Sequence, residues 1–300
     1  MTVEEWMTAY LALRAPDLAP RTLEQYQDLT TRYIVPAVGS LPLAELRPLA
    51  VAQLLAPISA QHPRTAQLVH RLLACALKCA VAYGLIDASP AAAVAAPRHR
   101  RADPRWLDAD TARALLVRTV GSRWHIAWSL ALCLGLRRGE LAGLRWGDVD
   151  LDKRQLTVSQ QVQLIGGHIV TGPPKSDAGL RSLPLPASLA AELAMWRRAQ
   201  RAPIGPNSYV LSCHADGGPV TPAAIGRALA RDMERAGLEP INLHGLRHTM
   251  ATMAVAQGVH LRVLQGLLGH ANISITADTY SHILPAALRN AVDTISDSVL

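Results

Sequence analysis

The sequence predicts a mixed fold: an all-α N-terminal part, then an α+β part that contains a small three-stranded antiparallel sheet. Three observations support this prediction. Residues 2–96 show only the helical periodicity of apolar side chains. The segment "APRHRRADPRW", residues 96–106, then interrupts the pattern with prolines and arginines. Beyond it, helical segments flank residues 155–186, in which apolar and polar side chains alternate with period two.

Four helices are predicted in the N-terminal part. The first, "TVEEWMTAYLAL" at 2–13, carries acidic residues in its first turn, and the second, at 19–39, starts at a proline and ends at a Pro/Gly stop. The third and fourth occupy 47–58 and 63–86, the last of them ending near Gly84. No catalytic constellation is found among these helices.

We therefore divide the chain into a helical domain at 1–96, a basic linker at 97–105 and a second domain at 106–300. The linker places four arginines between prolines: Arg98, Arg100, Arg101 and Arg105. Two interpretations remain open. The linker is either a solvated tether or a DNA-binding strap across a phosphate backbone.

The second domain is predicted to begin with helices at about 108–119 and 121–135. The alternating stretch that follows breaks at Gly166-Gly167 and again at 172–179, so it predicts a three-stranded antiparallel meander. Helices resume at about 187 and continue to the end of the chain, with turns near 203–221.

Composition favours a nucleic-acid partner. Thirty Lys+Arg residues face 23 Asp+Glu, and the pI is near 9.6, so a polyanion, nucleic acid before membrane, is expected. No N-terminal stretch has the order of a signal peptide, and the apolar run at 124–136 is too short to span a bilayer. The four cysteines show no disulfide framework and are expected to be buried small hydrophobes. A reduced, cytoplasmic protein is the simplest interpretation.

The stretch "LHGLRHTMAT", residues 243–252, brings two histidines and an arginine onto one helical turn. His244 and His248 have the i, i+4 spacing of a zinc pair, but Gly245 stands where a zinc protease needs its glutamate. Arg247 would also repel a cation. The stretch therefore favours an anion, and the zinc-hydrolase alternative requires that metal copurify with the protein.

Three other stretches supply groups of similar chemistry. Arg137 follows an apolar helix in "LGLRRGELAGLRW", with Glu140 placed to hold its guanidinium. Lys175 lies in the loop "PPKSDAGLRSLPLP", and "LLGHANISITADTYSH" offers His270 and Tyr280. In this order the blocks resemble the tyrosine recombinase (phage integrase) family, whose signature is R…K…H-x-x-R…H/W…Y. The resemblance covers about 106–290 and extends, more weakly, to the N-terminal helices.

The resemblance implies an all-α core-binding domain, a SAM-like helical bundle, before a catalytic domain with a C-terminal tail helix. It also implies a catalytic set with Tyr280 as the nucleophile: Arg137, Lys175, His244, Arg247, His270 and Tyr280. Two guanidiniums would meet the charge that develops on the scissile phosphate, and the tyrosine would form a 3′-phosphotyrosyl link whose religation needs no ATP. His244 would act as general base, His270 would bond a phosphate oxygen, and Lys175 would protonate the leaving 5′ oxygen.

We expect the two domains to form a C-shaped clamp around duplex DNA. By the same resemblance we expect site-specific DNA recombination, integration or excision, by four protomers on two double-stranded DNA sites. No metal or other cofactor is expected. The protein would be a monomer or dimer without DNA, with accessory DNA-bending or directionality proteins as further partners. Two alternatives stay open: a type IB topoisomerase, and a DNA-binding protein that no longer cleaves. His248 is expected either to pack in its helix or to support a catalytic group from behind, and His282 is left without a role.

Overall fold

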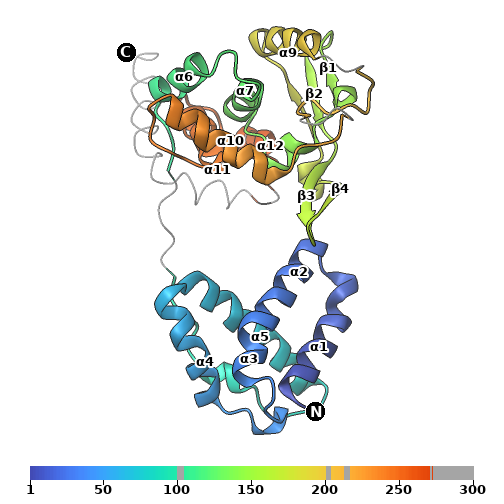
Figure 1. The fold of residues 1–300 in the computed structure, drawn as a ribbon, viewed down its shortest axis with the longest axis vertical. Helices are drawn as coiled ribbons and strands as arrows, with labels where there is room; N and C mark the ends of the chain where they lie inside the picture. The colour runs from blue at the N-terminus through green and yellow to red at the C-terminus, as the bar shows by residue number, and fades with distance from the viewer. Residues whose placement is uncertain (100–104, 201–203, 213–216, 271, 273–300) are drawn as a thin grey trace, which may run out of the picture. The chain divides into compact units, whose positions relative to one another are not determined.

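The structure, a computed structural model, describes residues 1–99, 105–200, 204–212, 217–270 and 272. It divides into two compact units, Met1–Ala102 and Asp103–Leu300. The first unit is helical, and the second combines helices with small antiparallel sheets (Figure 1). The predicted fold class is therefore confirmed. Residues 100–104 of the predicted linker lie outside the described residues.

The first unit contains the four predicted helices. The second of them runs without a break from α2 through a π-helical turn, Thr30–Ile34, into α3. The α-helices of this unit are α1 (Val3–Arg14), α2 (Pro20–Leu29), α3 (Val35–Val38), α4 (Pro48–Gln61) and α5 (Pro63–Ala82). Single 3₁₀ turns connect them at Ala15–Asp17 and Leu43–Glu45, and another follows α5 at Pro90–Ala93.

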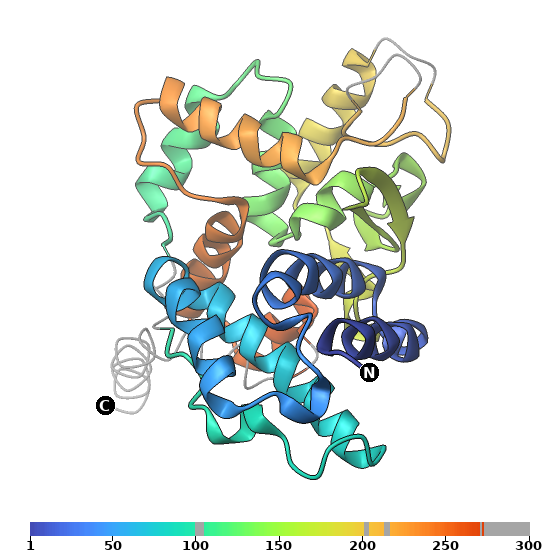
Figure 2. The same ribbon diagram turned by 60° about the horizontal axis from the view of Figure 1, so that its bottom comes forward.

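Helix α5 is the core helix of the first unit. It packs against α4 and α1, as both views show (Figures 1 and 2), and the indole N–H of Trp6 donates to the carbonyl of Ala76 over 3.0 Å. In the described part of the chain, α5 is the one helix long and apolar enough to cross a membrane by length and composition. Seven of its residues are buried against the rest of the unit: Ala66, Val69, Leu72, Leu73, Ala76, Leu77 and Ala80. These residues form one apolar face, which packs within the unit.

The second unit is built around α7, whose residues Ile126 to Leu132 are all buried. Helices α11 and α9 pack on α7, and α10 packs on α8. The helices of this unit are α6 (Ala109–Arg118), α7 (His125–Leu134), α8 (Arg138–Gly143), α9 (Ala187–Ala199), α10 (Pro222–Arg235), α11 (Leu243–Ala256) and α12 (Leu261–Leu268). The helices predicted at 108–119 and 121–135 correspond to α6 and α7.

The strands correct the predicted meander. The three-stranded sheet has the order β1-β2-β5, and β3 and β4 form a separate two-stranded hairpin. The strands are β1 (Val149–Asp150), β2 (Gln155–Val158), β3 (Gln161–Ile165), β4 (His168–Gly172) and β5 (Arg181–Pro184). Leu156 of β2 pairs with Leu183 of β5, and both are buried, whereas every residue of β4 before Gly172 is exposed. Burial of the β2 and β5 side chains thus selects a pairing that skips the intervening hairpin.

The cysteines differ from the prediction. Cys75 and Cys133 are exposed and Cys79 is half-buried, and all three are free thiols. Cys75 falls on the face of α5 opposite the buried stripe, so helical periodicity accounts for its exposure against the general preference of cysteine for the interior. Cys133 lies in the last turn of α7, beyond the run Ile126 to Leu132 that is buried on every face. Cys213 lies outside the described residues.

Candidate functional site

The N-terminus of α11 is fixed by two hydrogen bonds and one close backbone contact. The side chain of Asn242 accepts from the backbone N–H of Gly245 over 2.9 Å, which caps the helix. A side chain at Gly245 would approach the carbonyl oxygen of Arg105 to 2.9 Å. The segment that contains Arg105 is also held to α11 by a hydrogen bond, in which the Leu107 N–H donates to the Thr249 hydroxyl over 2.9 Å. Glycine at 245 therefore serves chain packing against α11, not zinc chemistry.

Arg247 is buried at the centre of the second unit, with only 2% of its surface exposed. Its guanidinium donates to the carbonyl oxygens of Gly135 over 2.6 Å and of Leu268 over 2.5 Å. Gly135 ends α7 with φ +63°, a left-handed conformation that glycine adopts at helix ends, and a side chain there would touch Leu268 at 3.0 Å. The termini of α7 and α12 are thus tied together by one arginine.

Arg137 and Glu140 interact as the sequence predicts. The carboxylate of Glu140 accepts from the Arg137 guanidinium over 2.6 Å and from the Arg137 backbone N–H over 2.9 Å, at the start of α8. A second guanidinium nitrogen of Arg137 donates to the carbonyl of Gly269 over 2.7 Å. The Arg137 side chain stays 37% exposed while Glu140 is 2% exposed, so the arginine can still meet a ligand.

Arg181 is a member of this site that the sequence analysis did not identify. Its guanidinium forks onto Glu140, donating to one carboxylate oxygen over 3.1 Å and to the other over 2.9 Å. It also donates to the carbonyls of Gly179 over 3.0 Å and Leu267 over 2.8 Å. One signal could have found it: alternation along β5 puts Arg181 on the same face as buried Leu183.

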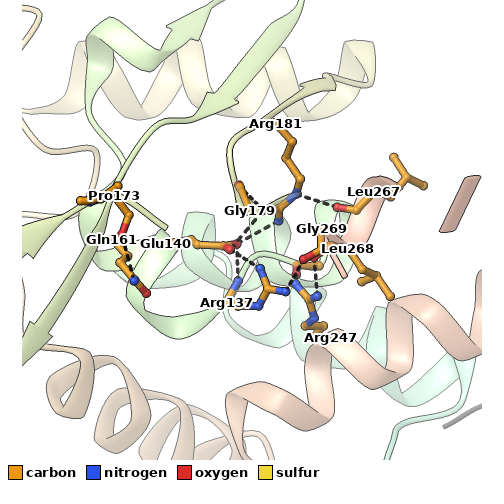
Figure 3. A network of polar contacts seen from close by, with 11 residues as sticks. Arg137, Glu140, Gln161, Pro173, Gly179, Arg181, Arg247, Leu267, Leu268 and Gly269 are labelled. Carbon is orange, nitrogen blue, oxygen red and sulfur yellow. Dashed lines mark hydrogen bonds and ion pairs between the residues drawn. The ribbon is translucent and has the colours of Figure 1, made fainter. Parts of the chain in front are cut away.

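The three arginines share the C-terminus of α12. Three consecutive carbonyls each accept from a different guanidinium: that of Leu267 from Arg181, that of Leu268 from Arg247 and that of Gly269 from Arg137. Figure 3 shows these side chains converging on the helix end, with Glu140 between two of them. The C-terminus of a helix carries partial negative charge, so it suits a cluster of cations. We call Arg137, Glu140, Arg181 and Arg247 the arginine cluster.

The charges of the cluster shift two nearby pKa values. Burial acts to raise the pKa of Glu140, but the hydrogen bonds and charge of Arg181 and the charge of Arg137 outweigh it, so the pKa lies below its usual value. For His270, burial and then the charges of Arg247 and Arg137 lower the pKa to about 4. His270 is consequently neutral at physiological pH. With three guanidiniums against one carboxylate, the site attracts an anion.

The other predicted histidines make local contacts of their own. His270 directly follows Gly269, and its backbone N–H donates to Gln265 over 3.2 Å. His244 is exposed at the start of α11, and its ring packs edge-on against that of buried His248, with centroids 4.4 Å apart. His248 thus packs within its helix as expected. Tyr280 and His282 lie outside the described residues.

Lys175 is exposed in the loop between β4 and β5. At the start of this loop the side-chain amide of Gln161 on β3 donates to the carbonyl of Pro173 over 3.0 Å (Figure 3). At its end, Gly179 packs on Pro174 so closely that a side chain would clash at 2.5 Å. Glycine at 179 therefore lets the loop close on itself.

The predicted DNA-binding arginines are only partly described. Arg98 is exposed, and Arg105 forms an exposed ion pair with Glu239 at 3.3 Å. Arg100 and Arg101 lie outside the described residues. An ion pair between two exposed side chains is weak, so Arg105 can exchange Glu239 for a phosphate at little cost.

The described residues offer no metal site. Among them, no group of three or more His, Cys, Asp or Glu side chains could hold a metal ion. His244 and His248 have no acidic or cysteine third ligand within the described part of the chain.

Comparison with known families covers nearly the whole chain. The model of the phage integrase family matches residues 105–286, and that of the phage integrase central domain matches residues 3–97. The two matched regions meet in the arginine-rich segment.

Relatives of similar sequence carry recombinase names. The chain is 32% identical over 247 residues to the tyrosine recombinase XerC of Xylella fastidiosa, which covers 77% of this chain and 76% of that protein. It is 33% identical over 195 residues to a XerC-like tyrosine recombinase of Caldanaerobacter subterraneus, which covers 59% of this chain and half of that protein.

Solved structures of low identity share the fold. A fragment of the Tn1549 transposon integrase, in complex with a circular intermediate DNA, superposes with a TM-score of 0.85 at 20% identity, covering 98% of this chain and 99% of that chain. The lambda integrase tetramer bound to a Holliday junction gives 0.69 at 20% identity, covering 91% of this chain and 78% of that chain.

Proposed function

Since this chain belongs to the phage integrase family and is a tyrosine-type site-specific DNA recombinase, we propose that it breaks and rejoins DNA strands through a 3′-phosphotyrosyl intermediate on Tyr280. The observation that carries the proposal is the arginine cluster, which holds three guanidiniums at the end of α12 beside His270, two of them bonded to the buried carboxylate of Glu140. Such fixed positive charge suits a phosphodiester, since its transition state gains negative charge.

The proposed roles follow the chemistry of each group. Arg137 and Arg247 donate to the non-bridging oxygens of the scissile phosphate. A small movement of either guanidinium away from its carbonyl partners would let it form two parallel hydrogen bonds to the phosphate. Neutral His270 donates one hydrogen bond to a phosphate oxygen. His244, exposed at the helix start, accepts the proton of Tyr280. Lys175 gives a proton to the departing 5′ oxygen, which an arginine cannot do because it stays protonated.

Recombination is favoured over the topoisomerase alternative by two findings. The helical unit matches the central domain of phage integrases, and the relatives of similar sequence are named as recombinases.

We propose double-stranded DNA as the partner, with a homotetramer on two sites and accessory DNA-bending or directionality proteins. The solved relatives include DNA complexes and a tetramer on a Holliday junction. A mobile element as the source and the cytoplasm as the location belong to the same proposal.

A covalent trap tests the proposal. The bound sequence is first selected from a pool of randomised duplexes, then made into a nicked suicide duplex that loses a short strand after cleavage. With excess EDTA present, the wild-type protein should become linked to a 3′ phosphate, since arginines supply the charge that metals provide in other phosphoryl-transfer sites. Tyr280→Phe should abolish the adduct while DNA affinity stays nearly unchanged, because one hydroxyl is lost.

Tyr209→Phe is the matched control. Tyr209 is a half-buried tyrosine that packs against the core of the second unit, so its variant should still be trapped. An adduct formed by Tyr280→Phe would assign the nucleophile to another residue. Complete loss of the adduct in EDTA, with recovery on addition of a divalent cation, would replace the proposed chemistry with a metal-dependent one.

A further inference from the structure

Arg181 is the connecting member of the arginine cluster. Like Arg137, it contacts both Glu140 and the end of α12. Unlike Arg137, it does so from β5, the strand that follows the loop of Lys175. Only 7% of its side chain is exposed, against 37% for Arg137. All three guanidinium nitrogens of Arg181 already donate to protein acceptors, and two of them donate to Glu140. Its charge is therefore spent on Glu140, and its contribution passes through its neighbours.

Glu140 shows what that contribution is. Its two carboxylate oxygens are each shared between Arg181 and Arg137, but Arg181 takes the paired, two-bond geometry. A buried carboxylate directs its full charge onto whatever cation remains beside it. Without Arg181, that cation would be Arg137, whose charge toward an incoming anion would then be largely cancelled. Arg181 therefore keeps Arg137 electrostatically available.

The contact of Arg181 with the Leu267 carbonyl fixes the position of the end of α12. The Nε of Arg181 donates to the carbonyl of Leu267, which precedes Gly269 by two residues. Gly269 lies so close to the 3₁₀ turn before β5 that a side chain would meet the Ala178 carbonyl at 2.6 Å. The end of α12 is thus clamped to β5, and His270 leaves from this clamped end. The chain continues from there toward Tyr280.

We propose that Arg181 is a positioning residue for strand cleavage: it neutralises Glu140 so that Arg137 presents its charge to the scissile phosphate, and it clamps the end of α12 that carries His270. The inference rests on the proposed function, since it assumes that the anion at this site is the phosphate attacked by Tyr280. It assigns no contact between Arg181 and DNA.

Three variants measured on the suicide duplex test the inference. Arg181→Met keeps the length and apolar volume of the side chain, and it should slow covalent trapping about ten- to a hundredfold, the range found when a group that orients an active-site ligand is removed. DNA affinity should change little. Arg181→Lys keeps the charge without the fork, so its trapping rate should fall between those of Arg181→Met and the wild type.

The double variant Arg181→Met with Glu140→Gln separates electrostatics from packing. It restores the net charge of the cluster, so trapping should be faster than in Arg181→Met alone. The pKa of His270, followed by NMR of labelled histidine, should rise in Arg181→Met and return toward the wild-type value in the double variant. If Arg181 merely filled space, the double variant would recover neither the trapping rate nor the pKa of His270.

Arg145→Met is the matched control. Arg145 forms a half-buried ion pair with Asp148, with 3.4 Å between the charged atoms, and it is not a member of the arginine cluster. It should leave both trapping and the His270 pKa unchanged. The inference is overturned if folded Arg181→Met or Arg181→Lys traps DNA at the wild-type rate, or if Glu140→Gln slows Arg181→Met further. If the wild-type protein itself is not trapped, the proposed function fails instead, and the two failures are thereby distinguished.

Discussion

The two units use positive charge in different ways. On α5 of the first unit, Arg64, Arg71 and Lys78 recur every seven residues and are exposed, and they line one shallow hollow along the helix. We call these three residues the α5 basic face. In the second unit, Arg181 and Arg247 are almost completely buried and bonded to backbone carbonyls.

Burial decides what each set can do. An exposed charge is screened by salt within roughly 10 Å and keeps its rotational freedom, so it adds affinity for a polyanion without fixing geometry. A buried guanidinium is fixed by its hydrogen bonds and acts through a lower dielectric. The comparison thus predicts that removal of buried arginines changes cleavage, whereas removal of the α5 basic face changes binding and its dependence on salt.

Lys175 is the strongest challenge to this comparison, since it is exposed and yet proposed to act in chemistry. Lys175→Ala should slow cleavage about a hundred- to ten-thousandfold, the usual contribution of a general acid. A duplex with a bridging 5′ phosphorothiolate should be cleaved nearly as fast by the variant as by the wild type, because sulfur leaves without a proton. Equal losses on the two substrates would exclude Lys175 as the acid and leave the comparison intact.

Arg247→Ala should show the largest effect among the buried arginines. Trapping should fall about a hundred- to a thousandfold, as when one donor to a developing oxyanion is removed. The carbonyls of Gly135 and Leu268 also lose their donor, so the free energy of unfolding should decrease in urea titrations. Arg113→Ala, at a side chain that is 72% exposed, is the control and should change neither quantity. Unchanged trapping by a folded Arg247→Ala would refute the role of buried charge.

The α5 basic face should matter for binding alone. Replacing Arg64, Arg71 and Lys78 by glutamine should flatten the slope of log K against log salt by up to about 0.9 for each phosphate that the protein no longer neutralises. At saturating protein, the trapping rate should equal that of the wild type. The same salt titration applies to a variant in which the four linker arginines are neutralised. A flatter slope would show that the linker binds the phosphate backbone, and an unchanged slope that it is a solvated tether. A trapping defect that persists at saturation would show that exposed charge also shapes the chemistry.

The smallest expected effect is on stability and concerns His270. Its pKa of about 4 lies below the ordinary value of 6.5, so between these values the unfolded chain binds a proton that the folded chain does not. The free energy of unfolding should therefore rise as the pH increases from about 4 to 6.5. His270→Gln should weaken this dependence, as measured by urea titrations at pH 4.5 and 7. An identical pH dependence in the variant would mean that the cluster does not act on His270.

Local patterns were sufficient to predict many elements. Apolar periodicity placed the four helices of the first unit and the helices α6 and α7, because one face of each must be buried. The spacing of Arg137 and Glu140 predicted their contact, since residues three apart on a helix start lie side by side. The catalytic roles of all six predicted residues remain predictions from motif order: Arg137, Lys175, His244, Arg247, His270 and Tyr280.

Pairings between distant segments could not be predicted in this way. The order β1-β2-β5 depends on which strands bury Leu156 and Leu183, and alternation alone does not say which neighbour a strand takes. The exposure of Cys133 likewise depends on what packs around the last turn of α7, which residue type does not reveal.

The sequence by itself thus determined the fold class, the basic character and the groups that suit a phosphodiester, because these depend on residue type and local spacing. Only the tertiary structure decided how those groups are held. Arg137, Arg181 and Arg247 come from α8, β5 and α11, and they meet at three successive carbonyls of α12. Helix ends leave carbonyls without intrahelical partners, and which distant arginine satisfies each one is fixed only when the segments pack together.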